Sequence, residues 1–193
     1  MYPSAGDRAI VEAFLAASGL DGRRPLVAIA PGTVWNTKRW PAEKFAETAA
    51  ILGESGMDIV LVGGEDDQAL AARMIATVSS RSVSSAVGKL SLLQSAELLR
   101  RCRVLVCNDS APAHLAVSVG TPVVAIFGAT VPEFGFAPRG ERDAVVEIKG
   151  LSCRPCSSHG GDACPIKTFE CMLMISARDV SRRVAEIVDR VAA

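Results

Sequence analysis

The residues best suited to do chemistry follow an apolar run in the middle of the chain. Asn108, Asp109 and Ser110 come directly after the apolar residues 104–106 and precede a segment, 111–119, with the composition of a helix. Helix N-termini carry unpaired N–H groups and the positive end of the helix dipole, so a strand, a polar turn and a helix together suit an anion such as phosphate. The alternative is that Asp109 and Ser110 only cap the helix.

A second polar segment, residues 31–41, also contains groups that bind phosphate. The candidates there are Gly32, Thr33, Thr37 and Lys38. A glycine lets a phosphate approach the backbone, the hydroxyls donate hydrogen bonds, and the lysine supplies a point charge. The spacing is neither that of a P-loop nor that of a dinucleotide-binding fingerprint. The two tryptophans of this segment, at positions 35 and 40, either shield the site from water or anchor the segment on the core.

Two further titratable residues stand near these segments. Glu65 follows two glycines at the end of another apolar run, the position of the acidic residue that binds ribose hydroxyls in nucleotide sites. Its alternative role is that of a carboxylate at a helix start. His114 is in the first turn of the helix after Ser110, where a histidine more often makes a structural hydrogen bond than acts as a base.

Four cysteines lie close together near the C-terminus with the spacing Cys-x2-Cys-x7-Cys-x6-Cys. They are Cys153, Cys156, Cys164 and Cys171. Four thiolates are a common ligand set for structural zinc, and zinc would hold together a loop that has little apolar content. The alternatives are reduced thiols that pack the loop, or a disulfide. The other two cysteines, at positions 102 and 107, are expected to be small buried residues.

These candidates must be positioned by an alternation of strands and helices. Apolar runs predict strands at 26–30, 59–62, 83–87, 104–106, 123–127 and 144–148. Amphipathic patterns predict helices at 7–18, 42–54, 65–77, 92–101, 111–119 and 176–191. This order predicts an α/β fold, a Rossmann-like parallel sheet with helices on both faces. Ligands bind beyond the carboxyl ends of such strands, so we expect residues 32–38, 64–66, 108–110 and 128–134 to meet at one rim.

The composition limits the classes of function. The chain has 193 residues, about the size of one domain, and its 21 basic residues balance 21 acidic ones. This balance gives no support for nucleic-acid binding. The N-terminus lacks a secretory signal and no apolar run is long enough for a membrane helix, so we expect a cytoplasmic protein without a transmembrane segment.

Taken in order, the motifs of this chain resemble the ADP-heptose:lipopolysaccharide heptosyltransferases, glycosyltransferase family 9. The resemblance covers about residues 25–190. The motifs are Pro31-Gly-Thr, Lys38-Arg-Trp-Pro41, Gly63-Gly64-Glu65, Asn108-Asp-Ser-x-Pro-x-His-Leu-Ala116, Phe127-Gly-Ala-Thr-x-Pro132 and Cys153-Arg-Pro-Cys156. It implies the C-terminal, nucleotide-sugar-binding half of a GT-B enzyme, which moves heptose from ADP-heptose to the inner core of lipopolysaccharide.

The resemblance implies that most of the candidate residues bind the donor, ADP-heptose. It implies that Lys38 and Thr33 hold the diphosphate and that the amides of Ser110 and Ala111 meet a phosphate. Leu90 would lie against the adenine. No Asp-x-Asp motif is visible, so we expect transfer to need no metal cofactor, and zinc would be structural only.

The same resemblance assigns the sugar end of the donor. Glu65 would bind the ribose, Asp109 would contact the sugar, and His114 would support the turn. Lys38 and the helix N-terminus would stabilise the charge that develops on the departing diphosphate, which makes Lys38 and Asp109 the expected catalytic residues of this half.

The resemblance also implies a missing N-terminal domain that supplies the general base and binds the lipid acceptor. Residues 1–24 would then be a helix and linker from the interdomain region, and residues 25–193 the donor domain, with the cysteine-rich loop 151–172 and a final helix, 176–191. We therefore expect a fragment that binds donor but transfers poorly alone, with the whole enzyme peripheral at the inner membrane. The alternatives are a nucleotide or UDP-sugar binding module and another GT-B enzyme.

Overall fold

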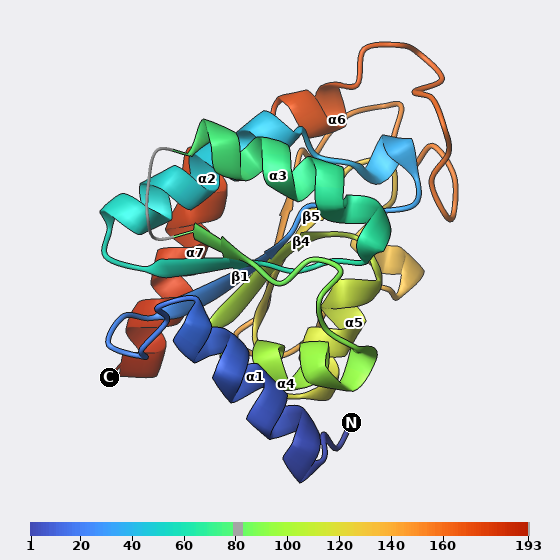
Figure 1. The fold of residues 1–193 in the computed structure, drawn as a ribbon. Coiled ribbons are helices and arrows are strands. Elements are labelled where there is room, and N and C mark those ends of the chain that lie inside the picture. The colour runs from blue at the N-terminus through green and yellow to red at the C-terminus, as the bar shows by residue number, and fades with distance from the viewer. Residues whose placement is uncertain (79–82, 193) are drawn as a thin grey trace.

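A computed structural model describes residues 1–78 and 83–192 and contains a six-stranded, entirely parallel sheet in the order β3-β2-β1-β4-β5-β6 (Figure 1). The strands are β1 Leu26–Ala30, β2 Asp58–Leu61, β3 Val83–Ser85, β4 Val104–Asn108, β5 Val123–Phe127 and β6 Ala144–Glu147. The predicted α/β, Rossmann-like fold is therefore confirmed. The strands begin and end within about two residues of the predicted positions.

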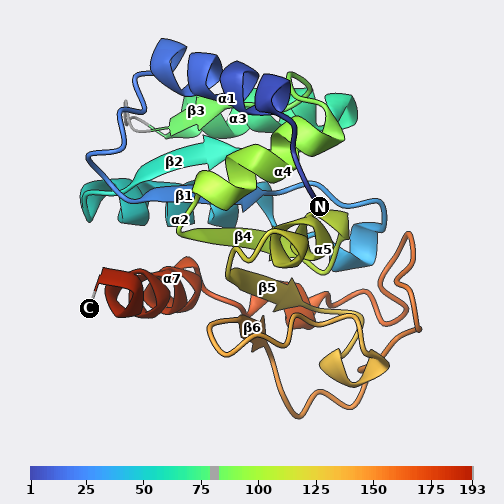
Figure 2. The same ribbon diagram turned by 90° about the horizontal axis from the view of Figure 1, so that it is seen from below.

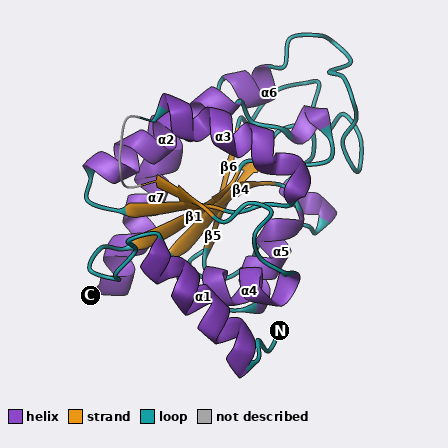
Figure 3. Ribbon diagram, in the orientation of Figure 1, coloured by secondary structure: helices purple, strands orange, loops and turns teal. Residues whose placement is uncertain are grey.

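Helices cover both faces of the sheet (Figures 1, 2 and 3). The helices are α1 Ala5–Ala17, α2 Ala42–Glu54, α3 Gln68–Thr77, α4 Leu92–Arg101, α5 Ala111–Ser118, α6 Glu170–Leu173 and α7 Ala177–Ala192. Three short 3-10 turns, Asn36–Lys38, Glu65–Asp67 and Pro132–Phe134, follow β1, β2 and β5. In Figure 1, α2, α3 and α7 lie on one face, and α1, α4 and α5 on the other.

The alternation of side chains along each strand explains these two layers. On β1, Val27 and Ile29 pack with α2 and α7, whereas Ala28 and Ala30 pack with α4 and α5. Because both faces are covered, the central strands β1 and β5 are apolar at every position, and β4 is apolar up to Cys107, without the polar alternation of a half-exposed sheet.

Local signals fix several helix ends. The Ser91 hydroxyl accepts a hydrogen bond from the Gln94 backbone amide, and the Gln94 side chain accepts one from the Ser91 backbone amide. This capping box starts α4 at the predicted residue. A second capping box at Ser4 starts α1 two residues earlier than predicted. After α5, Gly120 has a φ of 79°, the left-handed conformation in which a glycine ends a helix.

The segment between β6 and α7 contains the cysteine-rich loop and the short helix α6. In Figures 1 and 2 this loop lies at the edge of the molecule that carries the loop after β1, although more than 100 residues separate the two in sequence. None of the described helices has the length and apolar character that a bilayer crossing requires.

Candidate functional site

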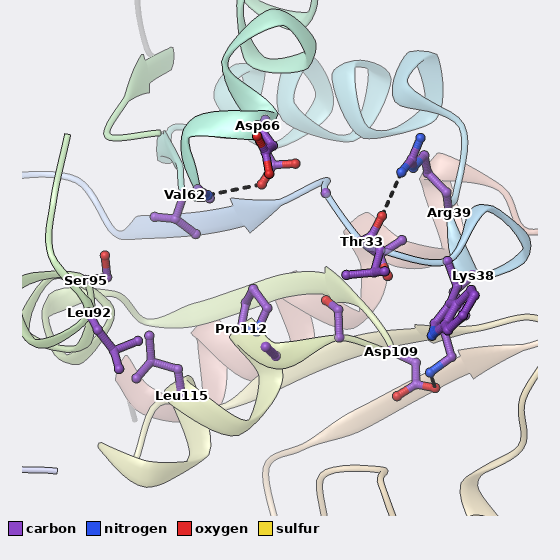
Figure 4. Close-up of a pocket in the computed structure, with 18 of the residues that line it drawn as sticks. Thr33, Lys38, Arg39, Val62, Asp66, Leu92, Ser95, Asp109, Pro112 and Leu115 are labelled. Carbon is purple, nitrogen blue, oxygen red and sulfur yellow. Dashed lines mark hydrogen bonds and ion pairs between the residues drawn. The ribbon is translucent and has the colours of Figure 1, made fainter. Parts of the chain in front are cut away.

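A pocket of about 850 Å³ opens at the carboxyl ends of the central strands (Figure 4). Most of its lining comes from three of the four turns that were predicted to converge, those after β1, β2 and β4, and the rest from Leu90 and α4. The fourth turn, after β5, reaches the site through Thr130, whose hydroxyl hydrogen-bonds Asp109. Pockets of this size hold nucleotide-sized ligands, and a parallel sheet places them at this rim.

Lys38 and Asp109 form a buried ion pair at one end of the pocket. The Lys38 Nζ lies 2.6 Å from the Asp109 Oδ2, and the side chains are only 11% and 5% exposed. Thr130 Oγ1 donates to the same carboxylate at 2.7 Å. Burying either charge alone is costly, so each partner offsets the charge of the other and holds it in place. The two residues on which the prediction depended are therefore in direct contact.

Asn108 joins the loop after β1 to the end of β4. Its Oδ1 accepts from the Trp40 amide at 3.0 Å, and its Nδ2 donates to the Pro31 carbonyl at 2.8 Å. Asn108 is fully buried, so these bonds have no competition from water. The sequence placed Asn108 among the polar residues suited to an anion; the structure makes it the connection that holds both ends of the Lys38 loop.

The two tryptophans of the Lys38 loop have different roles. Trp40 is fully buried, stacks edge-to-face on Phe45 with ring centroids 4.8 Å apart, and donates its indole N–H to the Ile175 carbonyl. It anchors the loop on the core. Trp35 is 39% exposed and lines the pocket. The anchoring role is thus confirmed for Trp40, and the shielding role stays a prediction for Trp35.

The start of α5 differs from the capping interpretation. Ser110 occupies the N-cap position, but no side chain caps the helix; the Ser110 hydroxyl donates instead to the Asn108 carbonyl at 3.2 Å. Asp109 is engaged by Lys38 and Thr130 rather than by helix amides. Ser110 and Ala111 both line the pocket, so the uncapped end of the helix faces a ligand space.

The smaller phosphate candidates of the Lys38 loop differ in position. Gly32 lines the pocket, so its phosphate role stays a prediction, but a Cβ there would also stand 2.0 Å from the Asp67 Oδ1. The missing side chain makes room for the Asp67 carboxylate. Thr37 is 3% exposed and is not among the lining residues; its hydroxyl accepts from the Gly161 amide. Thr33 does line the pocket, as predicted.

The far end of the pocket is apolar. Leu90, Leu92, Leu99 and Leu115 line it. Figure 4 shows Leu92 and Leu115 at the end opposite Lys38 and Asp109. The pocket thus has a charged end and an apolar end, the division that a nucleotide diphosphate requires.

Sequence reasoning missed another cation of the pocket. Arg39 lines it and donates from its guanidinium to the Thr33 carbonyl at 2.7 Å. Its position directly after Lys38 could have drawn attention to it, because two adjacent basic residues in a polar loop are a common feature of anion sites.

Two predicted site residues are not among those that line the pocket. Glu65 begins the 3-10 turn after β2 and is exposed, whereas the next two residues, Asp66 and Asp67, line the pocket. His114 is exposed on α5, and among the described residues no hydrogen bond to its ring is found. The ribose role of Glu65 and the supporting role of His114 therefore remain predictions.

The cysteines divide into two groups. Cys102 and Cys107 are buried, as predicted, and burial raises the pKa of each thiol far above its usual value. The four clustered cysteines are all free, and of these only Cys171 is buried. Burial, followed by the nearby Cys153 and Cys164 thiols, raises the pKa of Cys156, while hydrogen bonds from backbone amides, first that of Phe169, lower the pKa of Cys164.

Four thiols suit zinc chemically, but their arrangement does not present a ready site. Within residues 1–78 and 83–192, no three His, Cys, Asp or Glu side chains are grouped closely enough to share a metal ion. Zinc would therefore require the side chains of the loop to turn toward one another. The zinc hypothesis expects close to one zinc per chain when protein purified without chelator is measured by atomic emission, and a metal content near zero would contradict it.

Comparisons with known proteins identify the family. A family model described as glycosyltransferase family 9 (heptosyltransferase) matches residues 6–165. Lipooligosaccharide heptosyltransferase 2 of Haemophilus ducreyi is 36% identical over 117 residues, which cover 58% of this chain and 34% of that protein. A crystal structure of a glycosyl transferase of family 9 from Veillonella parvula is 26% identical with a TM-score of 0.83, over 98% of this chain and 53% of that one.

A second solved structure shares the fold. The E. coli ADP-heptose lps heptosyltransferase II superposes with a TM-score of 0.80 at 23% identity, over all of this chain and 54% of that one. The chain spans about a third of the length of the curated relative named above and about half of each solved structure. Since the family model matches most of its residues, the chain belongs to glycosyltransferase family 9.

Proposed function

We propose that this chain is the donor-binding part of an enzyme that transfers heptose from ADP-heptose to the inner core of lipopolysaccharide. The observation that carries the proposal is the Lys38–Asp109 pair at the charged end of a pocket whose other end is apolar. The names of the relatives support it, because one is a lipooligosaccharide heptosyltransferase and another an ADP-heptose enzyme.

In this proposal the parts of the donor would lie along the pocket in order. The adenine would lie against the leucine wall that includes Leu90 and Leu115, and the ribose would pass the acidic turn that carries Glu65 and Asp66. The diphosphate would reach Lys38 and the start of α5, where unpaired amides and the helix dipole favour negative charge.

The reaction would use Lys38 for charge stabilisation. As the bond between the anomeric carbon and the diphosphate breaks, negative charge develops on the departing oxygen. A fixed ammonium group in a largely buried position stabilises that charge more than water would. Asp109, which already holds Lys38, would lie toward the sugar end, and no metal ion is required in this scheme.

The remaining parts of the reaction are assigned to a domain outside this chain. We propose that an N-terminal domain supplies the general base and binds the lipopolysaccharide acceptor, and that residues 1–24 belong to the connection with it. The length of the relatives supports this, because the matched region is only 34% of the curated one. Contact with a lipid acceptor would bring the whole enzyme to the inner face of the cytoplasmic membrane.

The donor proposal is tested by nucleotide binding to this chain. We expect ADP at about 100 times its dissociation constant to stabilise the fold by about 2.7 kcal/mol. For a domain of this size, such a gain raises the melting temperature by roughly 5–10 °C. UDP at the same concentration is the matched control, since it carries the same diphosphate on another base.

The pattern of shifts separates the alternatives. A larger shift with UDP than with ADP would favour another GT-B enzyme or a UDP-sugar module. If neither nucleotide raises the melting temperature, the proposal that this pocket binds a nucleotide donor is contradicted. Transfer itself is tested with the whole enzyme, as release of ADP from ADP-heptose in the presence of a heptose-deficient lipopolysaccharide acceptor.

A further inference from the structure

The cysteine-rich loop 151–172 contacts the neighbours of both partners of the Lys38–Asp109 pair. Its tip lies against the turn that carries Lys38, and its root lies against the turn that holds Asp109. An inference drawn from these contacts rests on the proposed function, because it concerns how the donor site is held in shape.

On the Lys38 side, the loop forms a reciprocal pair of hydrogen bonds with Thr37. The Thr37 amide donates to the Gly161 carbonyl at 2.9 Å, and the Gly161 amide donates to the Thr37 hydroxyl at 2.8 Å. Asn36 adds a bond from its amide group to the Asp162 carbonyl at 3.1 Å. Thr37 is 3% exposed, so its two bonds with Gly161 hold the backbone next to Lys38 with little competition from water.

The loop tip also packs directly on the lysine stem. A Cβ added to Gly160 would stand 2.9 Å from the Trp35 Cβ and 3.2 Å from the Lys38 Cγ. Gly160 has a φ of 102°, a conformation that other residues rarely adopt. The absence of a side chain there lets the loop close on the lysine and restrict its rotamers.

On the Asp109 side, the loop root is fixed to the turn after β5. The Arg154 guanidinium donates to the Thr130 carbonyl at 2.8 Å, and the Cys156 amide donates to the Ala129 carbonyl at 2.8 Å. Thr130 in turn donates its hydroxyl to Asp109. The loop therefore determines the position of the residue that orients the carboxylate.

We propose that loop 151–172 is a clamp that pre-organises the Lys38–Asp109 pair for the donor diphosphate, with Thr37 and Thr130 as positioning residues. A lysine has a long flexible stem, and ordering it on binding weakens affinity. A clamp that orders the lysine before the nucleotide arrives removes that loss. Neither threonine needs to touch the donor for this role.

The test compares matched variants of the chain by calorimetric titration with ADP. Thr37→Val removes the hydroxyl at constant shape and is expected to weaken ADP binding about tenfold, while Thr37→Ser restores it to within about twofold. Thr48→Val is the control, because Thr48 is also fully buried and donates to the Lys44 carbonyl within α2, away from the pocket. It is expected to lower stability without changing ADP affinity.

A second pair of variants tests the loop tip without touching the core. Gly160→Ala is expected to weaken ADP binding about tenfold, because the new methyl group meets Trp35 and Lys38. Gly150→Ala imposes a similar backbone strain, at a φ of 80°, but nothing lies within 4 Å of the added carbon, so ADP affinity should not change.

The outcomes separate the clamp from the proposed function. If the unaltered chain does not bind ADP, the donor site and the clamp both fail. If the unaltered chain binds ADP but Thr37→Val and Gly160→Ala bind it equally well, the clamp alone is overturned. Equal loss of ADP affinity in Thr48→Val and Thr37→Val would also overturn the clamp. The loss would then come from the lower stability of the fold and not from the position of Thr37 beside Lys38.

Discussion

Replacing Lys38 by methionine is expected to weaken ADP binding at least about 100-fold, a loss of about 2.7 kcal/mol. The methionine keeps most of the stem but removes the ammonium group that we propose meets the diphosphate. It also leaves the Asp109 carboxylate, 5% exposed, without its partner at the edge of the proposed diphosphate site. Both effects oppose the nucleotide, and titration calorimetry measures their sum.

The same substitution also affects the fold, and the two effects must be separated. Loss of one partner of a buried pair costs about 3–5 kcal/mol of stability. The double variant Lys38→Met, Asp109→Asn removes both charges and should recover much of that stability while ADP binding stays weak. Lys149→Met, which removes an exposed lysine outside the pocket, is the control and should bind ADP normally. Normal ADP affinity in Lys38→Met would exclude Lys38 from the diphosphate site.

The fold could be predicted because the signals for it are local or follow from topology. The capping box at Ser91 and the glycine at position 120 are each readable over a few residues. The meeting of Lys38 and Asp109 follows from a rule about parallel sheets, since both residues come just after strands, β1 and β4, which are neighbours in the sheet. Neither required knowledge of a single side-chain contact.

The parts of the site that could not be predicted depend on contacts between distant segments. Thr130 holds Asp109 from 21 positions away, and Gly161 holds Thr37 from 124 positions away. No local pattern distinguishes these threonines from other polar loop residues. The capping alternative for Ser110 and the phosphate contact expected of the Thr37 hydroxyl fail for the same reason, because one residue type allows several partners and only the fold selects one.

Arg154 is another residue whose contacts depend on the fold, and replacing it by methionine is expected to have a large effect. Arg154→Met should lower the free energy of unfolding by about 3–5 kcal/mol. Its side chain is only 5% exposed and pairs with Glu147 at 3.0 Å. It also donates to the carbonyls of Gly128, Thr130 and Ile148. Methionine fills similar space but leaves a carboxylate and several carbonyls without a donor, and urea unfolding measures the loss.

The matched control is Arg182→Met on α7, where the arginine is 56% exposed and pairs with Glu186 one helical turn away. Exposed pairs contribute less than about 1 kcal/mol, so this variant should stay near the unaltered chain. Adding Glu147→Gln to Arg154→Met should recover part of the stability, because the isolated charge is removed. If the free energy of unfolding of Arg154→Met alone is within about 1 kcal/mol of that of the unaltered chain, water replaces the hydrogen bonds of the guanidinium and the prediction is wrong. If instead the loss occurs, ADP affinity should fall with it, since the carbonyl that Arg154 holds belongs to the residue that orients Asp109.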